Sequence, residues 1–174
     1  MQESKRRFTW DAIGDIAVGR PHLGPMARLE MYRLMQFSLR RVLEERLGAD
    51  AADQMVREAG QLAGEAFAER WLEPVTSLSD SVRRLQALFR EYGIGIVRME
   101  EADPEKGRFV FTVEEDMDCS GLPEADTEVC KFDEGFLAGI LAHATGRRYR
   151  VTEVDCWCSG ERICRFVAEA VSDP

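Results

Sequence analysis

The residues best suited to chemistry gather in the last third of this 174-residue chain, which holds all five of its cysteines. Four residues there, Cys130, Glu153, Cys156 and Cys164, are separated by 22, 2 and 7 residues. Thiolates and a carboxylate suit Zn²⁺, which usually takes four ligands in a closed structural site. The set predicts a zinc ion that joins the segment around Cys130 to a C-terminal hairpin.

Other arrangements of the same chemistry stay open. Cys119 and Cys158 compete for the fourth ligand position, and an iron–sulfur cluster held by four cysteines is a further alternative. The five cysteines would otherwise be buried, reduced side chains that pack as small hydrophobic groups. Glu153 and Cys156 lie three residues apart, so both can ligate only if their strand bulges or ends near Asp155. The two histidines show no ligand spacing, and no catalytic zinc is predicted.

Composition limits the remaining function classes. The apolar content of 45% and the charged content of 32% are typical of a folded domain, and the length fits a single domain over residues 1–174. A net charge of -9 argues against a nucleic-acid surface, which needs clustered Lys and Arg. The start, Met1 to Arg7, does not read as a secretory signal, and no apolar run is long enough for a membrane span. We expect a cytoplasmic protein that contacts neither membrane nor nucleic acid directly, with reduced thiols available to a metal.

Hydrophobic periodicity and breaker residues predict the secondary structure. The expected helices cover residues 27–47, 50–72, 77–92 and 133–145, and the expected strands cover 94–101, 108–115, 148–157 and 163–168, with a further short strand near 15–18. Helices come first, and a strand-strand-helix-strand-strand order follows. This order predicts an α+β fold in which N-terminal helices pack on an antiparallel sheet. A mainly helical half, 1–92, would precede a metal-binding half, 93–170.

Three local patterns carry further predictions. Met31, Met35 and Val42 repeat at helical spacing and predict a broad apolar face on the first long helix. Gly60 and Gly64 place small residues on adjacent turns of the second, which predicts close packing there. The acidic residues 114–118 read as a solvent-exposed strand end.

Aromatic residues supply the candidate wall of an apolar pocket. Phe109 and Phe111 share one strand face by the period of two, and helical Trp71 and Phe89 complete the predicted ligand-binding set. No Ser-His-Asp or Cys-His pair, paired carboxylates or Gly-rich phosphate loop is evident, so no catalytic residue is predicted. Whether the protein is an enzyme stays open, and a non-enzymatic function is favoured.

The stretch from Cys119 through Phe166 resembles the 4-vinyl-reductase, or hydrocarbon-binding, domain family. The resemblance extends more loosely over the whole chain and is carried by Cys130, Phe136-Leu137-Ala138-Gly139-Ile140-Leu141, Glu153-x-x-Cys156, Gly160-Glu161 and Cys164-x-Phe166. In phenol-responsive transcription activators that contain this domain, the positions of Cys130, Glu153, Cys156 and Cys164 bind a structural zinc. The resemblance implies the same ligand set here.

The resemblance also implies a fold similar to the haem-nitric-oxide-sensing and Golgi-tethering adaptor domains, usually homodimeric, with an apolar pocket between helices and sheet. The predicted function is therefore binding or sensing of a small apolar or aromatic molecule. One alternative is an accessory factor or reductase acting on a vinyl tetrapyrrole, for which the sequence shows no dinucleotide fingerprint. Another is a protein–protein adaptor that uses its first two helices. The chain shows no ATPase module or DNA-binding helical pair, so it does not by itself form a complete transcriptional switch.

Overall fold

The computed structural model describes residues 7–72, 77–125 and 128–171. The start of the chain, on which the absence of a secretory signal was predicted, lies outside this part except for Arg7. In chain order the elements are η1 (Trp10–Ile13), α1 (Ile16–Gly19), α2 (Leu29–Leu47), α3 (Ala49–Trp71), α4 (Leu78–Glu91), β1 (Ile96–Asp103), β2 (Arg108–Glu114), α5 (Lys131–Thr145), β3 (Tyr149–Asp155), η2 (Trp157–Ser159) and β4 (Cys164–Ala170).

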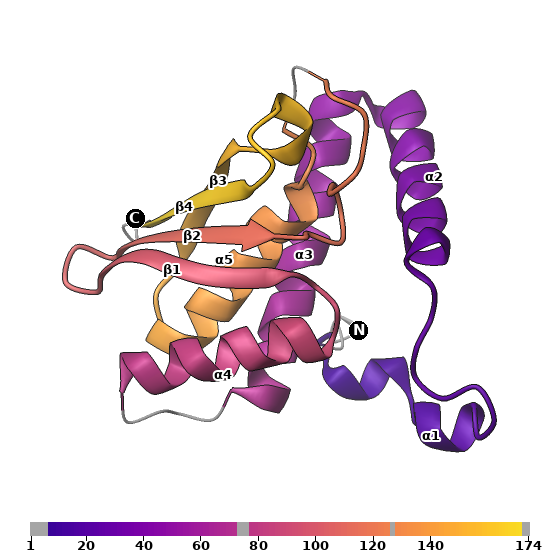
Figure 1. Ribbon diagram of the computed structural model, residues 1–174, viewed down its shortest axis with the longest axis horizontal. Helices are drawn as coiled ribbons and strands as arrows, with labels where there is room; N and C mark the ends of the chain where they lie inside the picture. Colours follow the sequence, from indigo (N-terminus) through magenta and orange to yellow (C-terminus); the bar gives the residue numbers. More distant parts are fainter. Residues whose placement is uncertain (1–6, 73–76, 126–127, 172–174) are drawn as a thin grey trace, which may run out of the picture.

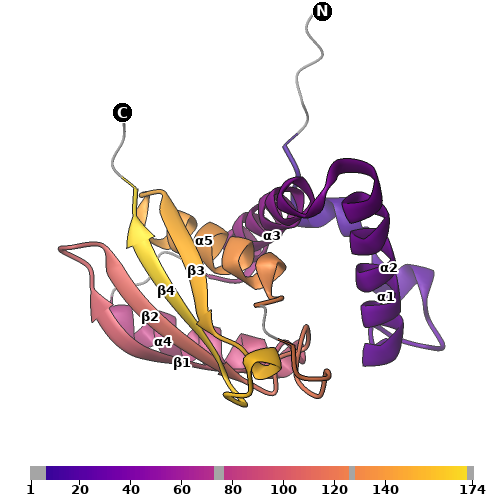
Figure 2. The same cartoon turned by 90° about the horizontal axis from the view of Figure 1, so that it is seen from above.

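The elements form layers around one antiparallel sheet with the strand order β1-β2-β4-β3. Helices α4 and α5 pack against the sheet, α3 lies behind α5, and α2 stands outermost beside α3 (Figures 1 and 2). The predicted α+β fold of helices on an antiparallel sheet is therefore confirmed. The strand predicted near residues 15–18 is wrong: the Asp15 side chain accepts a hydrogen bond from the Val18 N–H and caps the short helix α1 instead.

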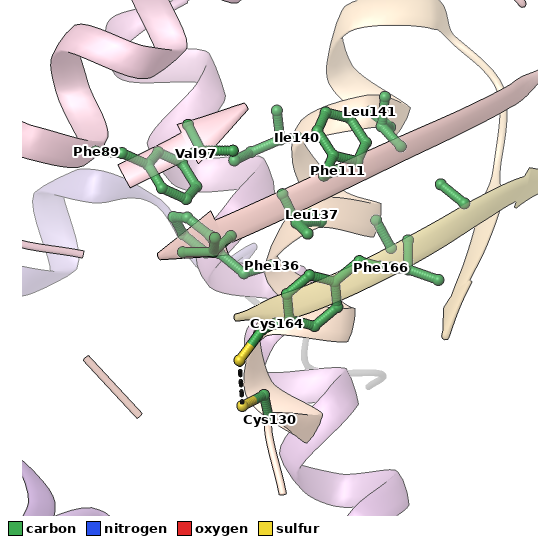
Figure 3. Packing of buried hydrophobic residues seen from close by; sticks show 14 of the residues in the cluster. Phe89, Val97, Phe111, Cys130, Phe136, Leu137, Ile140, Leu141, Cys164 and Phe166 are labelled. Carbon is green, nitrogen blue, oxygen red and sulfur yellow. Dashed lines mark hydrogen bonds between the residues drawn. The ribbon is translucent and has the colours of Figure 1, made fainter. Parts of the chain in front are cut away.

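The core lies between the sheet and α5. Strand β2 has a hydrogen-bonded neighbour on each side, and residues 109–113 are all buried. Figure 3 shows Phe111 and Phe166 of the sheet facing Leu137 and Ile140 of α5, with the sulfur of Cys130 at the lower end of this cluster. The cysteines thus extend the core at the N-terminal end of α5.

Helices α3 and α5 touch through their backbones. A Cβ atom added to Gly60 or Gly64 would overlap backbone atoms of Phe132 or Phe136 in α5. The contact is reciprocal, because a Cβ at Gly135 or Gly139 of α5 would overlap the backbone of α3. The close packing predicted at Gly60 and Gly64 is confirmed, and it fixes where α5 runs across the sheet.

Helix α2 carries its apolar residues on the side away from the protein. Met31 and Met35 are 61% and 64% exposed, and no residue of α2 is buried. Polar side chains instead face the rest of the chain: Tyr32, Arg33 and Gln36 bond to residues 116–120. The periodicity therefore located a real apolar face but not a buried one. None of the helices in the described ranges is long and apolar enough to cross a membrane.

Gly64→Ala tests the backbone contact between α3 and α5. We expect it to lower the free energy of unfolding by about 1–3 kcal/mol, since neither backbone can give way without repacking. Urea denaturation measures the change. The matched control is Gly19→Ala in α1, where no atom lies within 4 Å of the added Cβ and a change under ~0.5 kcal/mol is expected. Equal stability of the two variants would contradict the contact.

Candidate metal centre

Four cysteines from four separate segments meet at the N-terminal end of α5. Cys130 is the N-cap residue of α5, Cys156 is the N-cap residue of η2, and Cys164 begins β4. The fourth, Cys119, lies in the turn that follows β2. All four side chains are fully buried.

The sulfur atoms are close enough to share one ion. Sγ of Cys130 lies 4.0 Å from Sγ of Cys156 and 3.8 Å from Sγ of Cys164 (Figure 3). Sγ of Cys119 lies 3.1 Å from Sγ of Cys164, well beyond the roughly 2.05 Å of a disulfide bond. All four atoms lie within 4.8 Å of one another, and each cysteine is free. This group of thiols could hold a metal ion.

Glu153, the carboxylate of the predicted ligand set, lies against this group but is not part of it. Its Oε2 accepts the backbone N–H of Cys130 at 3.0 Å, and its Oε1 has no hydrogen-bond partner among the described residues. Burial, reinforced by the neighbouring Cys156, raises the pKa of Glu153 to about 8. The strand pairing shifts between Glu153 and Asp155, and β3 then ends, so the break needed for Glu153 and Cys156 to approach one site is present.

A tight turn fixes Cys119. Oδ1 of Asp116 accepts the backbone N–H groups of Asp118 at 2.7 Å and of Cys119 at 3.2 Å. Asp116 and Asp118 are each 1% exposed, so the prediction of a solvated acidic strand end is wrong for them. Burial and the negative charge of Asp118 raise the pKa of Asp116 to about 7. These carboxylates are buried because they fold the turn.

Helix α2 holds the same turn from outside. The Tyr32 hydroxyl donates to Oδ1 of Asp118 at 2.7 Å, and the Gln36 amide donates to Oδ2 at 2.8 Å. The Arg33 guanidinium donates to the carbonyl oxygens of Met117 at 2.7 Å and Ser120 at 2.9 Å. Burial and the Asp118 carboxylate raise the pKa of Tyr32, which stays a neutral donor. These bonds explain why α2 directs its polar face inward.

Acidic residues in the first turn of α5 complete the surroundings. Oε1 of Glu134 accepts the backbone N–H of Glu153 at 3.0 Å and bonds the Lys131 ammonium at 2.9 Å, while Oε2 pairs with Arg57 of α3. Glu134 thereby joins α3, α5 and β3, a role that the sequence did not suggest. Asp133 is 7% exposed, its Oδ2 lacks a partner in the described part of the chain, and burial raises its pKa.

A cavity of about 430 Å³ lies at the opposite end of α5. Phe109 and Phe111 line it, as predicted for two of the four pocket residues, whereas Trp71 and Phe89 are not in its wall. Trp71 packs edge-on against Trp10. The rest of the wall comes from α4, α5 and β1 and includes Ser81, Val82, Leu85, Met99, Ile140 and Leu141, with Ser77, Arg84, His143 and Thr145 as further polar members.

Comparison with known proteins identifies the segment that carries both features. Residues 109–170 match the family model of the vinyl-4-reductase domain. These residues form a domain of that family. The family resemblance predicted from the sequence is thus confirmed over β2, α5, β3 and β4. An uncharacterized protein of Methanocaldococcus jannaschii is 30% identical over 91 residues, which is 52% of this chain and 54% of that protein. The chain spans about half the length of the curated relatives it matches.

Solved structures share the fold. The phenol-responsive sensory domain of the transcription activator PoxR, solved with phenol, aligns with a TM-score of 0.67 and 18% identity over 84% of this chain and 76% of that one. A vinyl-4-reductase family protein from Methanocaldococcus jannaschii gives 0.59 and 16% over 86% and 85%. Trafficking protein particle complex subunit 3 from Naegleria fowleri, covalently bound to palmitic acid, gives 0.65 and 12% over 83% and 95%.

An H-NOX protein from S. oneidensis aligns less well, with a TM-score of 0.50 and 14% identity over 79% of this chain and 74% of that one. At these identities the likenesses establish the fold alone. They confirm the predicted relation to sensory, trafficking and H-NOX domains.

Proposed function

We propose that this protein binds or senses a small apolar or aromatic molecule in the cavity between α4, α5 and the sheet. The carrying observation is the cavity itself. Its volume of about 430 Å³ falls in the range of roughly 300–1,000 Å³ typical of small-molecule sites, and its wall is mainly apolar. Relatives of the same fold support the choice of ligand, because one was solved with phenol and another with palmitic acid.

The wall assigns roles to individual residues. Phe109 and Phe111, whose rings lie 6.4 Å apart at an interplanar angle of 26°, present an aromatic face to the ligand. Arg84, His143 and the Ser81 hydroxyl are the groups that can bond a single polar substituent. Burial of the ligand's apolar surface supplies most of the binding free energy, and the polar groups orient it.

A structural metal ion completes the proposal. Three predicted ligands, Cys130, Cys156 and Cys164, converge as zinc requires, and Cys119 and Glu153 offer the fourth donor. A closed four-ligand site leaves no open position for substrate, so the ion would hold β4, η2 and the start of α5 together. Free thiols at this density are kept reduced in the cytoplasm, which is where we place the protein.

The outward face of α2 supports a homodimer. Met31, Leu34, Met35, Leu39 and Val42 are each 44–64% exposed on one 19-residue helix. Met55 and Leu62 of the adjacent helix α3 are 46% and 49% exposed. An apolar surface of this kind is typical of an interface, and a second copy would cover it by two-fold symmetry. This assembly needs neither nucleic acid nor membrane.

Ligand binding is tested by thermal denaturation with phenol and toluene. Either compound should raise Tm if it binds, since a ligand at 100 times its Kd stabilises the folded state by about 2.7 kcal/mol. Ser81→Trp, which fills the cavity, should abolish the shift, whereas Ser79→Trp on the exposed side of α4 should keep it.

Absence of any shift in the wild type, for these compounds and a series of larger alkylbenzenes, would contradict the proposal. A vinyl tetrapyrrole incubated with a reductant belongs in the same series. Its turnover would favour the reductase alternative.

The dimer is tested by sedimentation equilibrium. The wild type should sediment as a dimer, and Met35→Glu with Leu39→Glu should shift it to monomer because charges would be buried in the interface. Val154→Glu introduces the same charge at an exposed apolar position on β3 and should leave the dimer intact. A monomeric wild type at all concentrations, or dissociation by the control alone, would refute this assembly.

A further inference from the structure

We infer that the fourth metal ligand in this chain is the thiolate of Cys119 and that Glu153 positions Cys130 from outside the coordination sphere. The inference rests on the metal centre proposed above and changes its donor set from three sulfurs and an oxygen to four sulfurs. The distinction is chemical: four thiolates favour Zn²⁺ strongly over harder cations and leave the site with a net negative charge.

The sulfur spacing carries the argument. A tetrahedron with metal–sulfur distances of about 2.3 Å has edges of about 3.8 Å. The distances from Sγ of Cys130 to Sγ of Cys156 and Cys164, 4.0 and 3.8 Å, match these edges. The 3.1 Å between Cys119 and Cys164 is shorter than an edge, so Cys119 is already within reach of an ion held by the other three. No backbone rearrangement is required to bring the fourth sulfur in.

The turn around Cys119 is built to hold that sulfur. The Asp116 carboxylate accepts the N–H of Cys119, and the Ser120 N–H donates to the Asp116 carbonyl at 3.1 Å. Arg33 and Tyr32 of α2 fix the carbonyls and the Asp118 carboxylate of the same turn. A ligand held by preformed backbone loses little conformational entropy when the ion binds.

Glu153 has a different task in this arrangement. Its Oε2 already accepts the Cys130 N–H at 3.0 Å, which fixes the backbone of a ligand at the N-cap of α5. The backbone N–H of Glu153 is held in turn by Glu134 at 3.0 Å. Carboxylates that orient ligands in this way belong to the outer shell of many metal sites. Because its Oε1 has no partner among the described residues, Glu153 is the natural competitor for the ion, and the experiment must separate the two.

The consequence reaches α2. With Cys119 as a ligand, the ion ties together the 116–120 turn, the start of α5, η2 and the start of β4. Because α2 grips that turn through Tyr32, Arg33 and Gln36, metal binding would also order the helix that carries the exposed apolar face. With Glu153 as the ligand, the turn would lie outside the metal centre.

X-ray absorption at the zinc edge of the full chain, purified without chelator, tests the inference on the wild type itself. We expect four sulfurs at about 2.3 Å and no oxygen or nitrogen near roughly 2.0 Å. Three sulfurs with one oxygen would overturn the inference while leaving the metal centre in place. A chain free of metal, or one that holds iron instead, would overturn both the inference and the zinc part of the proposed function.

Variants give a second readout through the cobalt-substituted protein, whose sulfur-to-metal charge-transfer absorption reports the number of thiolates. Cys119→Ser should lose about a quarter of that absorption, whereas Glu153→Gln should keep it and weaken metal affinity by about 10–100-fold as an outer-shell change. Cys158→Ser, which alters a buried cysteine outside the group of four, is the matched control and should bind like the wild type. Unchanged absorption in Cys119→Ser would refute the assignment.

Discussion

The fold of the C-terminal half depends on how four buried thiols and their acidic neighbours are accommodated at the start of α5. Cys130, Asp116 and Asp133 have ligand atoms within 4.8 Å of one another and are all buried. In the described residues, the two nearest cations of this region, Lys131 and Arg57, are both engaged by Glu134. Such a group is stable only when its acids and thiols keep their protons or when a bound cation takes their place. A divalent ion satisfies this constraint and also joins four chain segments.

Helix α5 connects that centre to the cavity. It begins after Cys130 and ends at Thr145, which lines the cavity, so its 15 residues span about 22 Å between the two sites. Its path is set by the glycine contact with α3, which brings the two backbones together and leaves the space between α4 and the sheet unfilled. The metal end and the cavity end of the molecule are therefore two ends of one rigid element. This arrangement gives the small-molecule site a wall whose position depends on the packing at the thiols.

Local sequence patterns were sufficient where the information is itself local. The period of two along β2 placed Phe109 and Phe111 together in the cavity wall, and the spacing of Glu153 and Cys156 indicated the break at the end of β3. The glycines of α3 signalled close approach because small residues on adjacent turns have few other uses. The family resemblance added the ligand positions that periodicity could not single out.

Features that depend on tertiary partners were beyond the sequence. The repeat of Met31, Met35 and Val42 shows that α2 has an apolar face, but which face is covered depends on the bonds of Tyr32 and Arg33 to a turn more than 80 residues away. Asp116 and Asp118 look like surface acids until the hydrogen bonds that bury them are known. Trp71 and Phe89 are large and helical, yet their packing directs them into the aromatic cluster and the core rather than into the cavity.

The central claim is that one metal ion holds the turn after β2, the start of α5 and the terminal hairpin together. Hydrogen exchange followed by mass spectrometry, on full-length protein before and after chelation, tests it most directly. The account predicts that chelation accelerates exchange in residues 116–125 and in the β3–β4 hairpin, while the α3–α5 contact keeps its protection. Protein of verified metal content that exchanges identically in both states would contradict the account.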